Sequence, residues 1–415
     1  MNDREVQRKA ASGAVMLSSG APDRPLPGLD LLSICTAQLS GRFPVDIFEG
    51  IETDLVIGEK TAKNPLTLQA PLFVPGSPYG EVGKNARLAF AYGSAIVGVA
   101  FGTGEGGVLP EEMEICRQFH GKCMVSWGPA RHGVLLDLLR SGDAVVMELF
   151  GHGRGCSSGL WRQERTTEAQ AKLWGMPQEM DWVLPPSHLD MEFPEDLKQH
   201  VALLRELTDH RTPVIVKLGA SRVIEEVKIV IESGADAVWL EALESPLYGA
   251  PDVIVEQAGL PLISVFGPAR RAFEETGARE KGVKLLVSGG MADGADVFKA
   301  LALGADAVGV PESARIAIGC SEGGAGNCHT GKCPAGIATT DPRLEAKLDW
   351  KTAGQSLANY LAALNDELKL LTAATGHTTV HGITMEDLRA LTYDAAALTG
   401  VKLAGYERVL PMWMH

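Results

Sequence analysis

The sequence lacks a basic bias, long hydrophobic runs and a secretion signal. Its 38 Lys and Arg residues are outnumbered by 52 Asp and Glu, which gives a net charge of −14 over 415 residues. No basic run stands out, and this argues against nucleic acid or an anionic membrane as a partner. The longest apolar runs, such as 144–149, are far too short to span a bilayer. The first residues, MNDREVQRKAASG, contain no apolar signal segment. We therefore expect a protein of the reducing cytoplasm.

Cysteine is scarce and odd in number, with seven residues. Disulfide frameworks usually carry an even number of cysteines at regular spacings, so this pattern does not indicate one. Four cysteines are scattered, and we assign them to packing: Cys35, Cys116, Cys123 and Cys156. The other three lie within fourteen residues of one another.

Short apolar runs alternate with helical patterns from about residue 70 onward. Each run is continuous rather than alternating, as in strands that are buried on both faces. The eight runs are 71–75, 95–100, 122–127, 144–149, 213–218, 237–241, 284–289 and 306–310. Amphipathic stretches such as 195–208 and 222–234 lie between them. This order predicts the α/β class and a (β/α)8 TIM barrel, with an open doubly wound sheet as the alternative.

We divide the chain into four parts. These are an N-terminal extension (1–65), the barrel (66–318), a cysteine loop (319–342) and a C-terminal helical tail (343–415). The extension holds few periodic elements and is expected to lie against the barrel. In the tail we expect a helix over 356–375 and, after Thr384 and Asp387 in an N-capping arrangement, a further helix.

The interval between the fourth and fifth runs, 150–212, is long and suggests a lid-like insertion on the catalytic face. It carries His152, His188 and Asp190 in loops rich in Gly and Pro. A lone polar residue in such a loop is more often at the surface than catalytic. We interpret each of the three in that way.

A glycine-rich turn follows the seventh predicted strand. Ser288, Gly289 and Gly290 end that strand, a helix follows, and the next strand ends near Val310. Glycines at the carboxyl end of a strand let backbone N–H groups approach a phosphate, and the next helix N-terminus adds positive potential. In barrels a phosphate site often follows strands seven and eight. These features favour phosphate binding over a pair of ordinary glycine turns.

Three cysteines form a compact motif, Cys320-x7-Cys328-x4-Cys333, with a proline directly after the last one. Thiolates are soft metal ligands, and glycines between them let a loop wrap around a cluster. The pattern indicates an iron–sulfur cluster. Zinc bound by the three thiols and His329 is the competing metal interpretation, and coincidental thiols in a loop are the alternative without a metal.

Two charged residues stand at the ends of predicted strands. In GTGEGG (102–107) the glycines can bring the backbone close to a ligand that Glu105 faces; a flexible loop with a solvated Glu is the alternative. Lys217 closes the fifth strand, where a charged residue is more often functional than structural in a barrel. It could hold a substrate carboxylate or an anionic cofactor, and a lysine that extends to the rim is the alternative.

Together these motifs resemble a known family. GTGEGG, LPPSHLD followed by PEDL, IVKL, SGGMADGADVFKALALGADAV and CHTGKCPAGIATTDP are similar to the FMN-binding synthase domain of glutamate synthases. The similarity is greatest to short stand-alone forms, including the FMN subunit of N-methylglutamate synthases. It covers nearly the whole chain.

The resemblance implies a barrel that holds FMN and a 3Fe–4S cluster ligated by the three clustered cysteines. In this family ammonia condenses with 2-oxoglutarate, and reduced FMN gives a hydride to the 2-imino acid. The resemblance implies an oxidoreductase acting on CH–NH2 donors, with Glu105 and Lys217 as catalytic residues. The residues expected to contact the cofactor are Gly102, Thr103, Gly104, Lys217, Ser288, Gly289, Gly290 and Gly304.

The resemblance also implies partners. The chain begins with Met-Asn rather than a nucleophilic Cys and carries no Gly-repeat domain. Separate glutaminase-type and Gly-repeat subunits in an oligomeric complex are therefore expected, with ferredoxin or a reductase as electron donor.

The sequence departs from the family pattern near the expected pocket. A Gly-rich DGxxGGTGAxP stretch is replaced by LEALESPLYGAP at 240–251, and a Gly-Thr pair by Pro311 and Glu312. Leu149 and His152 stand where the family has a Lys and a Gln, and the first cysteine spacing is longer than usual. An anion at Glu312 would repel phosphate unless it points away. Two alternatives follow: an FMN oxidoreductase on another imine or amine, or a cluster-carrying scaffold or electron-transfer subunit that has lost FMN catalysis.

Overall fold

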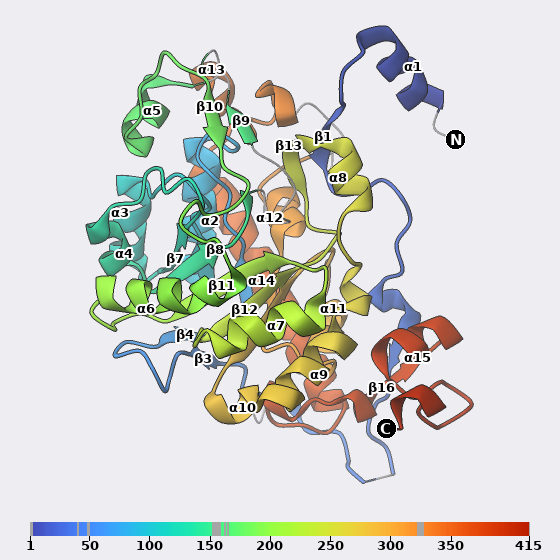
Figure 1. Cartoon of the computed structure of the whole chain (residues 1–415). Coiled ribbons are helices and arrows are strands. Elements are labelled where there is room, and N and C mark those ends of the chain that lie inside the picture. Colours follow the sequence, from blue (N-terminus) through green and yellow to red (C-terminus); the bar gives the residue numbers. More distant parts are fainter. Residues whose placement is uncertain are drawn as a thin grey trace.

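The computed structural model describes residues 3–39, 41–47, 50–151, 159–161, 163, 166–321 and 328–414. Its centre is a closed barrel of eight parallel strands in the order β11-β12-β14-β15-β5-β6-β7-β8 (Figure 1). The strands are β5 (Leu72–Val74), β6 (Ala100–Gly102), β7 (Lys122–Trp127), β8 (Ala144–Glu148), β11 (Val214–Gly219), β12 (Ala237–Glu241), β14 (Lys284–Ser288) and β15 (Ala307–Gly309). Pairing of β15 with β5 closes the sheet. The predicted barrel is confirmed, and the open sheet is excluded.

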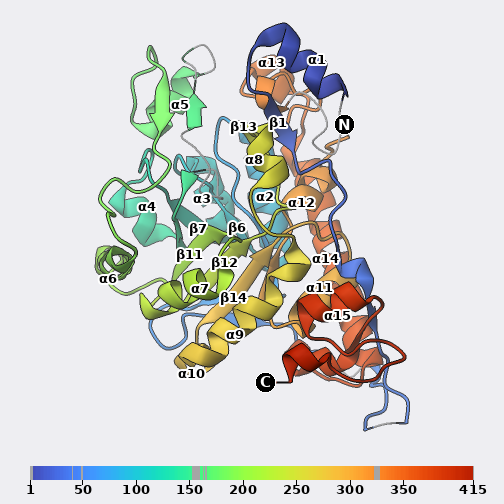
Figure 2. The ribbon, with the colours of Figure 1, turned by 45° about the vertical axis from the view of Figure 1, so that its right-hand side comes forward.

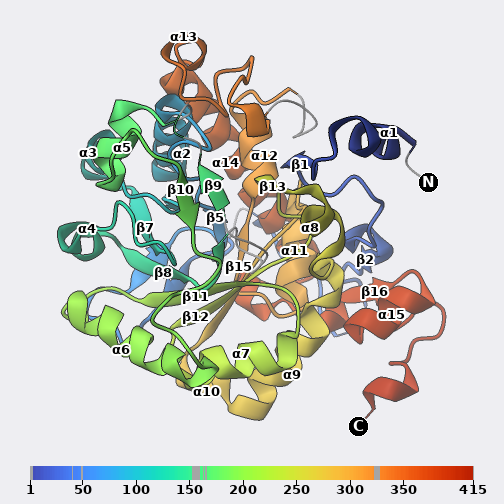
Figure 3. The ribbon, with the colours of Figure 1, turned by 45° about the horizontal axis from the view of Figure 1, so that its top comes forward.

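Helices surround the barrel, and others lie on the segments outside this ring (Figure 3). They are α1 (Asp3–Ser12), α2 (Lys84–Val97), α3 (Pro110–Phe119), α4 (Leu136–Ser141), α5 (Glu168–Trp174), α6 (Leu197–Leu207), α7 (Val223–Glu232), α8 (Asp252–Gln257), α9 (Phe266–Thr276), α10 (Ala278–Lys281), α11 (Gly294–Ala302), α12 (Pro311–Ala317), α13 (Pro342–Glu345), α14 (Trp350–Ala374) and α15 (Tyr393–Thr399). Helix α14 packs against both α2 and α11 and so completes the ring. Within the described ranges, no helix combines the length and apolarity needed to cross a membrane.

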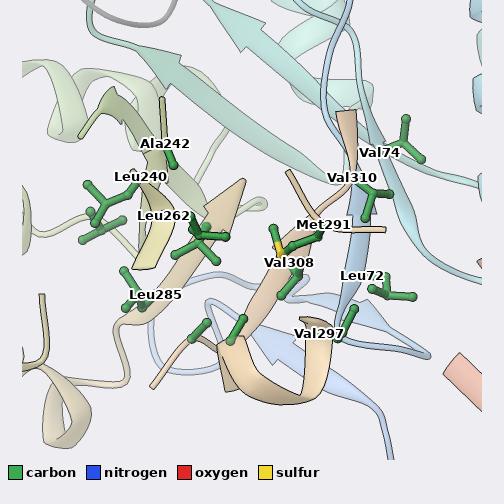
Figure 4. Packing of buried hydrophobic residues seen from close by; sticks show 14 of the residues in the cluster. Leu72, Val74, Leu240, Ala242, Leu262, Leu285, Met291, Val297, Val308 and Val310 are labelled. Atoms are coloured by element: carbon green, nitrogen blue, oxygen red, sulfur yellow. The ribbon is translucent and has the colours of Figure 1, made fainter. Parts of the chain in front are cut away.

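The strand side chains alternate between two apolar layers. Phe73 and Trp239 point into the barrel and belong to its interior cluster. Leu72, Leu285 and Val308 belong to the larger cluster between strands and helices, which Figure 4 shows across three neighbouring strands. Both faces of these strands are covered, which explains why the runs in the sequence are continuously apolar.

A hairpin from the N-terminal segment closes the amino end of the barrel. β3 (Leu55–Ile57) pairs with β4 (Leu66–Leu68), and Figure 1 shows the hairpin below the barrel. The side chains of Leu55, Ile57, Leu66 and Leu68 are each 1% exposed or less and join the interior cluster. The amino end is therefore a packed apolar base.

The N-terminal segment also reaches the opposite end of the molecule. β1 (Leu17–Gly20) pairs with β13 (Leu247–Pro251), and Figure 2 shows this pair above the barrel. β2 (Leu32–Ile34) pairs with β16 (Leu388–Ala390). The insertion forms a further small sheet, in which β9 (Gly159–Trp161) pairs with β10 (Trp182–Leu184). The insertion and β13 thus bring segments far apart in the sequence to the carboxyl end of the barrel.

The second predicted strand, 95–100, is wrong in its position. Residues 95–97 are the end of helix α2, which Gly98 terminates in a left-handed conformation (φ 73°), and the strand begins at Ala100. The side chains of this helix are buried between the barrel and α14. A short apolar run from such a helix cannot be told from a buried strand by its pattern.

The C-terminal tail also differs from its prediction. The first expected helix is α14, but it begins earlier, at Trp350. Thr384 and Asp387 do form a capping box, but they cap a single 3-10 turn over Met385–Asp387. β16 follows directly because it pairs with the N-terminal β2. The pairing with β2 has therefore overridden the local helical signal, and the next helix is α15, which begins at Tyr393.

Candidate functional site

The carboxyl ends of the barrel strands surround a cavity of about 100 Å³. Its lining comes from strand ends, the insertion, β13 and α12. The lining residues are Pro75, Gly76, Ser77, Pro78, Glu81, Gly104, Glu105, His132, Glu148, Trp161, Leu184, Lys217, Glu241, Pro246, Leu247, Tyr248, Pro311 and Arg315. Active sites of such barrels lie at this end, so the cavity is the candidate functional site.

Lys217 lies between two buried carboxylates. Its Nζ atom is 3.2 Å from Glu148 Oε2 and 3.4 Å from Glu241 Oε1, and all three side chains are at most 10% exposed. The same Nζ atom lies 4.9 Å from the centroid of the Trp239 ring. The residues come from β8, β11 and β12, which are neighbours in the barrel. Lys217 is thus held inside the mouth and does not extend to the rim.

Two pKa values at the mouth are strongly perturbed, those of Lys217 and Glu105. Burial by itself lowers the pKa of Lys217, but Glu148 and Glu241 outweigh it and raise this pKa above its usual range. Burial, aided by Glu148 and opposed by Lys217, raises the pKa of Glu105 to about 8. At pH 7 Glu105 is therefore mostly protonated and neutral. Lys217, Glu148 and Glu241 then contribute one positive and two negative charges.

Two carboxylate oxygens of the cavity lining have no hydrogen-bond partner among the described residues. They are Glu105 Oε1 and Glu241 Oε2, both buried. Glu148, by contrast, accepts from Ser126 Oγ at 2.8 Å and from Lys217 Nζ at 3.2 Å. Buried polar atoms are rarely left without a partner. Each of the two oxygens therefore carries the cost of an unmade hydrogen bond in this arrangement.

The loop that carries Glu105 is held in place by its neighbours. A Cβ atom at Gly76 would lie 2.2 Å from the backbone nitrogen of Gly104, so only glycine allows the two turns to approach this closely. On the other side, the fully buried Arg87 and Glu112 form an ion pair at 2.7 Å, and Arg87 also donates to a carbonyl of the loop. The position of Glu105 is thus set by the fold.

The insertion contributes an aromatic wall. Trp161 of β9 and Leu184 of β10 line the cavity. The Trp161 ring centroid is 5.1 Å from that of Trp174, which is 4.8 Å from the ring of His132. Burial lowers the pKa of His132 to about 4, so its ring is neutral at pH 7. The insertion therefore places the Trp161 ring at the mouth, where the neutral His132 ring from the loop after β7 also lines the cavity.

His188 is not the surface histidine that its loop predicted. It is 1% exposed, and its Nε2 atom is 2.9 Å from the carbonyl oxygen of Glu148, within hydrogen-bonding distance. Burial lowers its pKa. His188 thus supports the strand end that carries Glu148. Asp190 is half exposed, in an ion pair, as expected of a surface residue, and His152 lies outside the described residues.

Tyr248 of β13 fills part of the mouth. Its hydroxyl donates to Glu312 Oε2 at 2.6 Å, and the Arg315 guanidinium lies 3.7 Å from its ring centroid. Arg315 also pairs with Glu81 and donates to Ser77 Oγ at 3.0 Å. The bulky residues that replace the family's glycines therefore form a wall, in which Glu312 faces Tyr248.

The residues expected to contact a cofactor are only partly brought together. Gly104 and Lys217 line the cavity, as does Glu105. Five others lie around the same end of the barrel but outside the described lining: Gly102, Thr103, Ser288, Gly289 and Gly290. Gly304 precedes β15 and so lies at the amino end. The structure separates it from the phosphate turn, because parallel strands place the start of β15 and the end of β14 at opposite ends.

The cysteine segment lies beside β13. The 3-10 turn over Cys328–Thr330 contacts β1 and β13. Cys333 is buried, whereas Cys320 and Cys328 are half-buried, and burial raises the pKa of Cys328 to about 12. In the described part of the chain, no three His, Cys, Asp or Glu side chains are placed to hold a metal ion. Residues 322–327 and Cys156 lie outside that part. The iron–sulfur and zinc interpretations both stay predictions.

Three important residues were missed in the sequence. Glu148 and Glu241 close apolar strands in the same way as Lys217, so the same signal could have found them. Arg315 carries no such signal, because its role arises from contacts with β13 and with the turn after β5.

The fold and the mouth define a (β/α)8-barrel protein with a polar cavity at the carboxyl ends of its strands. The family model described as the conserved region in glutamate synthase matches residues 36–378. The chain therefore belongs to the glutamate synthase family.

The relatives agree with this assignment, and a solved structure agrees with the fold. The chain is 33% identical to the glutamate synthase large subunit-like protein of Rhizobium meliloti, over 97% of this chain and 93% of that protein. It is 30% identical to the archaeal-type glutamate synthase [NADPH] of Thermotoga neapolitana, over 97% and 80%. Mandelate oxidase, solved as its monooxide FMN adduct, has a similar fold, with a TM-score of 0.52 at 18% identity over 87% and 88% of the two chains.

Proposed function

We propose that this chain is an oxidoreductase subunit of a glutamate synthase-type complex, with FMN as its redox carrier. Its reaction is the reduction of a 2-imino acid formed from 2-oxoglutarate and ammonia or an amine. The family match and relatives named glutamate synthase support this. The observation that carries the proposal is the buried group of Glu105, Glu148, Lys217 and Glu241 at the mouth.

We assign proton donation to Glu105. Because its pKa is about 8, it is a neutral carboxylic acid at pH 7, inside a cavity that can hold a small nitrogen compound. Such an acid can give its proton to a nitrogen whose basicity rises as the adjacent carbon is reduced. Lys217, which lowers the pKa of Glu105, is the nearby cation that stabilises the carboxylate left after the proton is given.

Replacing Glu105 with Gln tests this assignment. Gln keeps the size of the side chain but has no acidic proton, so kcat should fall about 10²–10⁴-fold. The measurement is glutamate formation by chemically reduced protein from 2-oxoglutarate and ammonia, detected by mass spectrometry. The exposed Glu225→Gln serves as a control that should retain the rate. An unchanged rate in the Glu105 variant contradicts the assignment.

The residues at this end of the barrel have the chemistry to bind FMN, but the cavity there is too small for it. The turn at 288–290 can offer backbone N–H groups to a phosphate, and Lys217 can face an anionic ring. The cavity, however, measures about 100 Å³, whereas ligand pockets usually measure about 300–1,000 Å³. The ring therefore does not fit in this arrangement. FMN binding requires Tyr248 and Arg315 to leave the mouth.

The same wall favours a second candidate function. Arg315 is stacked on Tyr248 and held by Glu81 and Ser77, so several contacts oppose opening. A barrel that stays closed would be a scaffold or electron-transfer subunit that carries a cluster on its cysteines and has lost FMN. The three thiols at Cys320, Cys328 and Cys333 suit iron by their chemistry.

A visible spectrum and a metal analysis of anaerobically purified protein separate the two candidates. Bound flavin together with iron supports the oxidoreductase. Iron without flavin, even after incubation with FMN, supports the scaffold. Zinc in place of iron overturns the cluster, and a protein that binds neither FMN nor iron overturns both candidates.

A further inference from the structure

We propose that the N-terminal segment of residues 13–23 is a strap that keeps the mouth of the barrel in its closed form. Its release lets the wall of Tyr248 and Arg315 withdraw, and so admits a ligand that the closed cavity of about 100 Å³ excludes. The inference rests on the proposed function only where that ligand is taken to be FMN.

The strap is paired with the strand that carries the wall. Figure 2 shows β1 beside β13 above the barrel, and in this antiparallel pair Ser19 lies opposite Tyr248 and Gly20 opposite Leu247. Leu247 and Tyr248 both line the cavity. A strand from outside the barrel therefore fixes the backbone of two residues at the mouth.

Hydrogen bonds on either side of β1 extend this attachment. The backbone nitrogen of Asp252, directly after β13, donates to the carbonyl oxygen of Met16 at 2.8 Å. The backbone nitrogen of Asp23 donates to Glu256 Oε1 on α8 at 2.7 Å. The turn over Cys328–Thr330 contacts both β1 and β13. The strap thus holds β13 over its whole length.

The pairing with β1 is the main support that β13 receives from a sheet. Among the described strands β13 pairs with β1 alone, and it is not part of the barrel. An isolated two-stranded pair is at best marginally stable in water, and a register shift between Leu17 and Ser19 interrupts this one. Removing β1 therefore leaves β13 as an unpaired strand, attached at the mouth through the contacts of Tyr248 with Glu312 and Arg315.

The outer side of the strap is loosely packed. Helix α1 precedes it, and Figure 1 shows this helix outside the ring of helices. The side chains of α1 that the structure describes are exposed, as are Val15 at 65% and Leu17 at 47%. Segments with few buried apolar contacts open at a low free energy. The strap can therefore come away without unfolding of the barrel.

Closure by the strap lowers the apparent affinity for a large ligand. When a ligand binds only the open mouth, its affinity is reduced by the fraction of molecules that are open. Any change that frees β1 raises this fraction and should tighten the binding of such a ligand. By linkage, binding of the ligand should loosen the strap to the same extent.

Hydrogen–deuterium exchange of full-length variants tests whether the strap holds the wall. Ser18→Glu places a charge at a position of β1 that is 5% exposed, and the cost of burying an unpaired charge opposes the pairing. The amides of β13 should exchange faster in this variant, whereas those of β8, inside the barrel, should exchange as in the wild type.

Two further variants separate release of the strap from other effects of the charge. Ser18→Lys should act like Ser18→Glu, because burial opposes a charge of either sign. Ser12→Glu makes the same change on the exposed end of α1 and should leave the exchange of β13 unaltered. Exchange of β13 as in the wild type in both Ser18 variants overturns the inference.

Fluorescence titration with FMN tests the consequence for binding. Ser18→Glu should tighten FMN binding about tenfold by raising the open fraction, as Tyr248→Gly should by removing the ring. The two gains should not add when the changes are combined, because the strap acts through the wall. Additive gains, or tighter binding in the Tyr248 variant alone, overturn the inference. If no variant binds FMN, the proposed oxidoreductase is overturned, and the exchange of β13 by itself decides whether the strap holds the wall.

Discussion

The two ends of the barrel are built from opposite kinds of side chain. At the amino end, four aliphatic residues of the β3–β4 hairpin fill the interior and are almost completely buried. At the carboxyl end, Lys217, Glu148 and Glu241 are buried nearly as deeply, and two carboxylate oxygens lack partners among the described residues. The same eight strands thus join an apolar base to a charged mouth.

The two ends therefore contribute differently to the stability of the fold. Burying an apolar side chain stabilises the fold by about 1.5–3 kcal/mol. Burying a charged group carries a desolvation penalty that its ion pairs at best offset. A fold that places such a penalty where barrels hold their active sites has the pattern expected of a functional site.

The largest effect is expected from Lys217→Met. It leaves two buried carboxylates without their cation, so the free energy of unfolding should fall by about 3–5 kcal/mol. Urea denaturation at pH 7 measures this loss. Combining the change with Glu148→Gln and Glu241→Gln should recover most of it. A loss below about 1 kcal/mol in the single variant would show that the cluster is hydrated.

At the other end, Leu66→Ala should destabilise the barrel by about 2–5 kcal/mol, because it opens a cavity in the packed base. Glutamate formation should be unchanged in the protein that remains folded. Leu39→Ala, at a side chain that is 88% exposed, is the matched control and should have almost no effect. Loss of glutamate formation in the folded Leu66 variant would show that the two ends are not independent.

Glu105→Gln should make stability less dependent on pH. The folded-state pKa of Glu105 is about 8, far above the unfolded value of about 4.3. Between these values the folded state keeps the proton and the unfolded state releases it, so wild-type stability falls as the pH rises and levels off above about 8. Gln stays neutral at every pH. The stability of the variant relative to the wild type should therefore rise by roughly 2–4 kcal/mol between pH 5 and pH 8.5. Parallel pH curves would contradict the raised pKa.

The smallest effect is expected from opening the wall. Tyr248→Gly removes the ring on which Arg315 stacks and should tighten FMN binding about tenfold, or ~1.4 kcal/mol. Fluorescence titration with FMN measures this. Tyr406→Gly removes an equal side chain from an exposed turn and should change nothing. Equal FMN affinity in the Tyr248 variant and the wild type would show that the wall does not control access.

The fold was largely predictable because barrel strands are short, buried and continuously apolar. The run at 122–127 corresponds residue for residue to β7. The run at 95–100 failed because a helix buried between the sheet and α14 shows the same local pattern. The capping pair Thr384 and Asp387 failed for a different reason, since pairing with β2 makes a strand of the residues that follow.

The candidate site was predictable only in part. Lys217 stands out in the sequence because a charge that closes an apolar strand is unusual, and Glu148 and Glu241 show the same signal. The contact between Tyr248 and Arg315 shows no signal, because a strand that pairs with the N-terminus and a helix after the eighth strand meet only in the folded molecule.

The sequence by itself determined the barrel and its family, because apolar periodicity and local motifs are written in neighbouring residues. Only the tertiary structure decided the charge, size and closure of the mouth. Those properties depend on distances between side chains from separate strands, and burial then sets how strongly these groups act on one another.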